Sequence, residues 1–141
     1  MAIKQISAFV ENKSGKLAEI TSYLNDAEIN IRAFAISDTA DFGILRMIVS
    51  DPERAEEILQ DNRVSVSITE VLVVSIPDVR GSFAQCVKVL AQAGENIEYA
   101  YAFLTPEAGC ATVIIRVDDP KAAAKALSDA GIRVLEQDEI I

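Results

Sequence analysis

This chain has few residues of the types that act as nucleophiles, general bases or metal ligands, and this limits the classes of function open to it. The 141 residues include no histidine, which removes the Ser–His and Cys–His nucleophile pairs, the usual zinc ligands and the commonest general base. The two cysteines, Cys86 and Cys110, form no CxxC pair, so we expect a buried core thiol at Cys86 and a structural role for Cys110. An enzyme would have to use carboxylates, lysines or a cofactor, and the sequence shows no cofactor loop. We therefore predict no enzyme, no cofactor and no metal site.

Charge and hydropathy exclude further classes of function. The formal net charge is −9, from 22 acidic and 13 basic residues. Nucleic-acid binding depends on clustered Lys and Arg, so this balance argues against a nucleic-acid partner. The chain has no basic start followed by an apolar run, and no apolar stretch of about 18 residues. We expect a soluble, cytoplasmic protein with no membrane partner.

The chain carries one pattern twice. Gly15 and Gly81 are 66 positions apart, as are the pairs Asn30–Ile31 and Asn96–Ile97. After a two-residue insertion the spacing becomes 68, and Asp51–Pro52 matches Asp119–Pro120. A repeat of this length predicts two copies of one small domain, at residues 1–70 and 71–141.

Each copy predicts the order strand, helix, strand, strand, helix, strand. Alternating apolar residues indicate the strands, and apolar residues spaced by three and four indicate the helices. The expected strands cover residues 3–10, 29–37, 44–49 and 64–68, then 71–76, 97–104, 111–117 and 132–137. The expected helices cover residues 17–27, the segment beginning at Pro52, residues 83–90 and residues 122–130. Ser82 and Gln85 fit a capping box at the start of the third helix, and Gly131 is expected to end the fourth.

This order predicts an α+β fold of two ferredoxin-like βαββαβ units, with antiparallel sheets and both helices on one face. The fold hosts many functions, so the function has to come from a site. A metal chaperone would need two cysteines in the first loop, an RNA-binding unit exposed aromatic and basic residues on its central strands, and an acylphosphatase an arginine in a glycine-rich loop. The sequence lacks all three patterns.

The two glycine loops resemble a known family. The first loop reads Asn12-Lys13-Ser14-Gly15-Lys16-Leu17 and the second Asp78-Val79-Arg80-Gly81-Ser82-Phe83, and each is followed about fifteen residues later by the Asn-Ile pair. This set resembles the ACT domain, a small regulatory module of amino-acid metabolism, and the resemblance covers the whole chain as two domains in tandem. One departure is that Ser14 and Arg80 stand where the family often has a proline before the glycine.

The resemblance implies a binding site for a free amino acid at the seam between two ACT units. The implied ligand-binding residues are Asn12, Lys13, Ser14, Gly15, Lys16 and Leu17 facing Asn96 and Ile97, and Asp78, Arg80, Gly81, Ser82 and Phe83 facing Asn30 and Ile31. Backbone N–H groups at a helix N-terminus suit the carboxylate of such a ligand. Because Asn12 is neutral and Asp78 would repel a misplaced carboxylate, we expect the Asn12 site to bind more tightly.

Other interpretations of these residues remain open. Gly15 and Gly81 are compatible with simple strand-to-helix turns, and Asn30 and Asn96 with strand-start residues that bond the local backbone. Aromatic residues alternate along residues 99–103, where the first copy has small ones, which fits either seam packing or a wall for the ligand side chain.

The favoured function is a non-catalytic regulatory protein that binds a free amino acid and forms a homo-oligomer, expected to be a dimer. Its target would be an enzyme of amino-acid metabolism or another copy of itself. The alternative is a regulatory subunit or an oligomerisation and interaction module without a small-molecule effector.

Overall fold

The structure is a computed structural model that describes residues 2–38, 41–103 and 108–140. It divides into two compact units: residues 4–69 form one, and residues 70–140 form the other together with Ala2 and Ile3. Leu104, the last residue of the predicted strand 97–104, lies outside the described residues.

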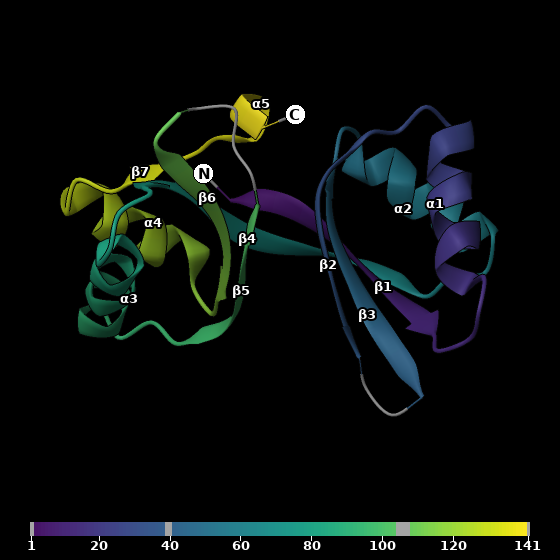
Figure 1. Ribbon diagram of the computed structural model, residues 1–141, viewed down its shortest axis with the longest axis horizontal. Coiled ribbons are helices and arrows are strands. Elements are labelled where there is room, and N and C mark those ends of the chain that lie inside the picture. Colours follow the sequence, from purple (N-terminus) through teal and green to yellow (C-terminus); the bar gives the residue numbers. More distant parts are fainter. Residues whose placement is uncertain (1, 39–40, 104–107, 141) are drawn as a thin grey trace. The chain divides into compact units, whose positions relative to one another are not determined.

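The unit of residues 4–69 has the predicted element order (Figure 1). Its elements are β1 (Ile3–Glu11), α1 (Lys16–Asp26), β2 (Ile31–Asp38), β3 (Phe42–Val49), α2 (Pro52–Asp61) and the first part of β4 (Val66–Pro77). The strand order in its sheet is β2-β3-β1-β4, and β3 pairs antiparallel with both β1 and β2. The strand β2 is therefore an edge strand of this unit.

The unit of residues 70–140 repeats this plan with the second part of β4 as its first strand. The further elements are α3 (Ser82–Gln92), β5 (Ile97–Phe103), β6 (Cys110–Val117), α4 (Pro120–Asp129), β7 (Arg133–Val134) and α5 (Gln137–Ile140). The strand order is β5-β6-β4-β7, with antiparallel pairing at each step. The predicted α+β fold of two ferredoxin-like units is confirmed, and here β5 is the edge strand that corresponds to β2.

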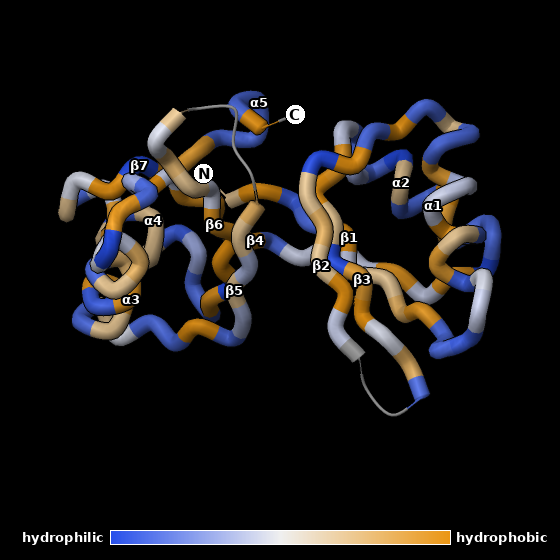
Figure 2. Tube along the Cα trace, viewed as in Figure 1, coloured by the Kyte–Doolittle hydropathy of each residue, from blue (hydrophilic) through white to orange (hydrophobic). Residues whose placement is uncertain are grey.

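Each unit has its own hydrophobic core between its sheet and its two long helices. In the first unit α1 contributes Ile20 and Leu24, which pack with residues of β1, β3 and α2. In the second unit α3 contributes the buried Cys86 and Leu90 in the same way. Figure 2 shows the hydrophobic colour running along the central strands. The prediction of a buried thiol at Cys86 is confirmed, and both cysteines are free.

The four long helices begin in two different ways. The carboxylates of Asp51 and Asp119 accept hydrogen bonds from Arg54 N and Ala122 N, both at 3.2 Å, and so cap α2 and α4. By contrast, the N-cap residues that precede α1 and α3 are Gly15 and Gly81, and no side chain there donates or accepts a capping hydrogen bond. The predicted capping box at Ser82 is therefore wrong, because Ser82 is already the first helical residue, one position too late to cap.

The end of the chain also differs from the prediction. The expected strand over residues 132–137 is only two residues long, and Gln137 begins α5. The Glu139 carboxylate accepts hydrogen bonds from the Glu136 N–H at 2.8 Å and from Arg133 at 2.6 Å. These bonds favour a helical turn in a segment whose hydrophobic pattern alone resembled a strand.

Candidate functional site

Both predicted glycine loops turn directly from a strand into a helix. Gly15 has φ of +89° and Gly81 has φ of +93°, a left-handed conformation that glycine adopts without steric cost. In the first loop Asn12 N donates to Asp41 O at 3.1 Å and Lys13 N donates to Glu11 O at 2.8 Å. These bonds fix the loop beside the start of β3.

The loops leave some donors free at the N-termini of α1 and α3. Lys16 N donates to Lys13 O, and Ser82 N donates to Val79 O, each at 3.3 Å. The Lys16 N–H, which we expected to face a ligand, thus already has a partner within its turn. Because no side chain caps either helix, the neighbouring first-turn N–H groups, such as that of Leu17, stay available to an anionic group.

A hollow lies beside the first glycine loop. It has a volume of about 330 Å³ and is lined by Asn12, Lys13, Leu17, Ile36 and Ser37, among others. Three predicted site residues are therefore brought together, at the end of β2. Leu17, one of the predicted ligand-binding residues, is exposed.

An equivalent hollow lies beside the second loop. Its volume is about 340 Å³, and its lining includes Asp78, Val79, Ser82, Phe83 and Ala102. Val79, which was not among the predicted ligand-binding residues, is exposed and belongs to this lining. Val79 lies between two predicted site residues in the loop, and this position was the sequence signal from which it could have been predicted.

Other predicted residues lie away from these hollows. Ser14 and Gly15 line neither, and Lys16 lines a cavity on the opposite side of its loop. Likewise Arg80 and Gly81 line a cavity on the opposite side of the second loop. Each glycine loop thus separates two cavities of its unit.

The Asn-Ile pairs lie at the far end of the edge strands. Asp38 at the end of β2 pairs with Gly43 beside the first loop, whereas Ile31 pairs with Val49 at the opposite end. Seven residue steps of about 3.3 Å separate these ends by roughly 23 Å. Asn30 therefore does not reach the glycine loop of its own unit, and the same holds for Asn96, which directly precedes β5.

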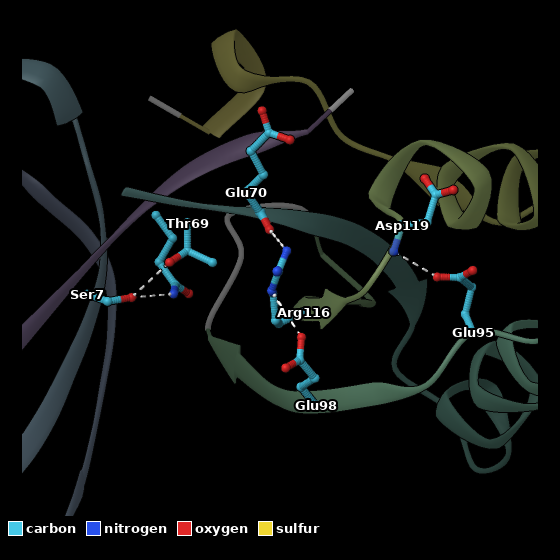
Figure 3. Close-up of polar contacts among 8 residues, drawn as sticks. Ser7, Thr69, Glu70, Glu95, Glu98, Arg116 and Asp119 are labelled. Carbon is cyan, nitrogen blue, oxygen red and sulfur yellow. Dashed lines mark hydrogen bonds and ion pairs between the residues drawn. The ribbon is translucent and has the colours of Figure 1, made fainter. Parts of the chain in front are cut away.

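Local hydrogen bonds hold the backbone at these strand starts. Asn30 N donates to Ser50 Oγ at 3.0 Å, and Ser50 N donates to Asn30 O at 2.9 Å. Neither bond uses the Asn30 side chain. In the second unit the Glu95 carboxylate accepts from Asp119 N at 3.1 Å, next to Asn96 (Figure 3).

The two edge strands carry opposite patterns of large and small residues on the face that bears the helices. Phe34 and Ile36 of β2 pair with core residues of β3, yet they are 67% and 51% exposed. The corresponding residues of β5 are Ala100 and Ala102, which pair with core residues of β6. The helix-side edge is thus bulky in one unit and hollow in the other.

On the other face the pattern is reversed. Tyr99 and Tyr101 of β5 stack with ring centroids 6.5 Å apart, where β2 has Ala33 and Ala35. Beside them Arg116 Nε lies 3.2 Å from the Glu98 carboxylate, and Arg116 Nη1 donates to Glu70 O at 2.9 Å (Figure 3).

Within the described parts of the chain, no group of three acidic or cysteine side chains is arranged to hold a metal ion. No helix described there is long and apolar enough to span a bilayer. The acids that begin α2, including Glu53 with its Lys4 partner, lie on the surface.

Comparison with known proteins identifies the family. A family model described as an ACT domain pair matches residues 1–141, and the chain belongs to this family of paired ACT domains. No curated protein matches the chain in sequence.

Solved structures agree with this assignment. Protein BT0572 from Bacteroides thetaiotaomicron is 40% identical, with a TM-score of 0.93, covering 99% of this chain and 96% of that one. The ligand-free regulatory subunit of aspartate kinase from Thermus thermophilus is 19% identical, with a TM-score of 0.65, covering 90% and 91%. The corresponding subunit from Thermus flavus is 17% identical, with a TM-score of 0.65, covering 91% and 92%. The last two likenesses concern the fold.

Proposed function

We propose that this protein is a non-catalytic, cytoplasmic regulator that binds a free amino acid, with residues 1–70 and 71–141 as its two ACT domains. The observation that carries the proposal is that α1 and α3 each follow a left-handed glycine and have no side-chain cap, and that each begins beside a hollow of more than 300 Å³. The other two long helices are capped by aspartate. Uncapped N–H groups attract a carboxylate.

The proposed site needs a second unit to complete it. Because the Asn-Ile pair and the glycine loop lie at opposite ends of an edge strand, only antiparallel pairing of two edge strands brings one pair to the other loop. Pairing β2 of one copy with β5 of a second copy sets Asn96 and Ile97 opposite the Asn12–Leu17 loop. The same pairing sets Asn30 and Ile31 opposite the loop with Asp78 and Phe83. A homodimer would thus hold its ligands at the seam.

The side chains of the edge strands support this cross-pairing. With the helices of both units on one side, Phe34 and Ile36 would meet the small residues Ala100 and Ala102. On the other face Tyr99 and Tyr101 would meet small residues of β2. Pairing β2 with a second β2 would instead place large residues against large ones.

The regulated partner in this proposal is an enzyme of amino-acid metabolism. The similar structure from Thermus thermophilus is a regulatory subunit of aspartate kinase, which supports this choice of partner.

The test is thermal unfolding of the protein against each common amino acid at millimolar concentration. A ligand present at a hundred times its Kd adds about 2.7 kcal/mol to the free energy of unfolding, which raises Tm by roughly 5–10 °C for a chain of this size. One or two related amino acids should give such a shift, and Asn96→Ala should abolish much of it. A panel with no shift would contradict amino-acid binding.

The two sites should differ in affinity. Asn12→Ala should weaken binding more than Asp78→Ala, because the neutral Asn12 amide can donate to the carboxylate of the ligand, whereas the Asp78 carboxylate favours the ammonium group and repels a misplaced carboxylate. Calorimetric titration of both variants measures this directly. A larger loss in Asp78→Ala would reverse the proposed order of the sites.

A second candidate function is an interaction module without an effector. The apolar lining of the second hollow, with Val79, Phe83 and Ala102, favours it, since a partner side chain such as Phe34 of another copy could fill that space. A flat amino-acid panel together with an intact dimer would support this candidate.

A further inference from the structure

Each unit has a cavity on the side of its glycine loop that faces away from the edge strand. In the unit of residues 70–140 its volume is about 560 Å³, and in the unit of residues 4–69 about 210 Å³. The two cavities occupy equivalent places in the repeat: Val10 and Val64 line the smaller one, and the matching Ile76 and Ile132 line the larger one. Because the surrounding fold is the same, the two cavities can be compared residue by residue.

Smaller side chains open the cavity in the second unit. Phe9 corresponds to Ser75 and Phe42 to Cys110 in the strand register, and Arg63 corresponds to Gly131. All six residues line their respective cavities. Two aromatic rings and one long side chain have thus been replaced by a hydroxymethyl group, a thiol and a hydrogen atom, which leaves room for a ligand.

The charge of the lining has changed as well. Arg80 and Arg133 line the large cavity, where the first unit has Ser14 and Ser65. No Asp or Glu is among the described residues that line it, whereas Glu11 and Glu19 line the small one. In a chain with a net charge of −9, a cavity whose charged lining residues are both arginines attracts anions.

The two arginines differ in their present contacts. Among the described residues Arg80 is exposed and makes no ion pair. Arg133 lies 2.6 Å from Glu139 of α5, and their side chains are 54% and 35% exposed. Such a solvent-screened pair is weak, so an anion that engages both arginines can displace the Glu139 carboxylate.

We propose that this arginine cavity, defined by Arg80, Arg133, Ser82 and Gln85, binds a small organic oxyanion carrying a carboxylate or phosphate group. The planar guanidinium forks of arginine match both groups bidentately, and Ser82 and Gln85 add neutral hydrogen-bonding groups. The volume falls within the usual range of small-molecule pockets, and Ile76, Pro77 and Ile132 offer apolar contact to a carbon skeleton. Glu139 acts as an internal competitor. The proposal does not depend on amino-acid binding at the seam.

The experiment is an NMR titration of the ¹⁵N-labelled full chain with inorganic phosphate and, separately, with succinate. Sodium chloride keeps the ionic strength constant. The Arg80 and Arg133 Nε–H signals and the Gly81 amide should shift saturably with at least one probe. Saturation with phosphate alone identifies a phosphate ligand, and saturation with succinate alone a carboxylate.

Three variants decide whether the arginines form the site. Arg80→Gln and Arg133→Gln should each weaken the affinity for the probe at least fivefold, and Glu139→Gln should strengthen it about threefold or more by removing the competitor. The matched control Arg63→Gln, at the small cavity, should leave the affinity unchanged. The gain expected for Glu139→Gln is informative even if an arginine variant fails to fold.

Chemical-shift changes that grow linearly with probe concentration, and that are as large at Arg32 and Arg54 as at Arg80 and Arg133, would overturn the proposal. An unchanged affinity in the two arginine variants would overturn it as well. A Tm shift in the amino-acid panel that Asn96→Ala removes reports on the seam, whereas a shift that Arg80→Gln removes reports on the arginine cavity. Failure of that panel with saturable phosphate or succinate binding would reject the proposed function and leave the arginine cavity standing.

Discussion

Gly15 combines a left-handed backbone with open surroundings, which makes the cost of replacing it predictable. A Cβ at this position would meet no atom within 4 Å, so only the backbone conformation resists substitution. Gly15→Ala should lower the free energy of unfolding by about 1–2 kcal/mol. Gly15→Asn should cost less, because asparagine tolerates this region better. Urea denaturation of both variants measures the difference, and equal costs would contradict a purely conformational role.

The two thiols should react at very different rates. Burial raises the pKa of the Cys86 thiol, whereas Cys110 is only half-buried. A thiol reagent at pH 8 should modify one cysteine rapidly and the second only after unfolding, and Cys110→Ser should remove the fast phase. Two fast thiols in the folded protein would contradict the buried position of Cys86.

The raised pKa of Cys86 also fixes a direction of pH dependence. Its folded-state pKa lies above the unfolded value, so the folded state favours the neutral thiol. The resulting contribution to stability is fully present below the unfolded-state pKa and is lost as the pH rises through the folded-state pKa. Cys86→Ala should flatten the alkaline decline of stability, with Cys110→Ala as the control.

Among the helices of the second unit, α4 is capped by a side chain and α3 is not, so the contribution of the cap to stability can be tested within that unit. Asp119→Ala removes the side-chain acceptor for Ala122 N and should cost about 1 kcal/mol. Ser82→Ala removes no cap and should change the free energy of unfolding by less than about 0.5 kcal/mol. Chemical denaturation measures both, and a larger loss for Ser82→Ala would restore the capping box that the structure does not show.

The elements also show how far local sequence signals reach. The proline after Asp51 and after Asp119 marks the starts of α2 and α4 correctly, because capping and proline preferences act within one turn. The prediction of a strand over residues 132–137 was wrong for most of its length, because the hydrogen bonds of Glu139 to Glu136 and Arg133 compete with strand pairing. An alternating hydrophobic pattern carries no information about such competing side-chain hydrogen bonds.

At the scale of the whole molecule, the exposed edge strand β2 predicts self-association. Phe34→Asp should convert the proposed dimer to a monomer, because it places a charge where the seam would bury an aromatic ring. Phe9→Asp is the matched control: Phe9 is 54% exposed but lies on the interior strand β1. Size-exclusion chromatography with light scattering measures the mass of each variant. A dimer that survives Phe34→Asp but not Phe9→Asp would exclude the proposed seam.

The repeat lets one scaffold carry different linings at equivalent places. The hollows beside the two glycine loops differ at Asn12 against Asp78 and at Ile36 against Ala102. The cavities behind the loops differ at Ser65 against Arg133. Both copies keep apolar residues at the equivalent core positions, so the exposed linings can differ without disturbing either core.

Local patterns in the chain are enough to predict the βαββαβ order, the repeat and the positions of Gly15 and Gly81, because periodicity and left-handed glycine geometry are local properties. The side of each loop that a residue faces follows instead from the pairing of distant strands. Strand register places Ile36 beside Asn12 and Cys110 beside Arg80, across gaps of more than twenty residues in the chain. No local pattern encodes those juxtapositions, since they depend on how the strands of each sheet pair.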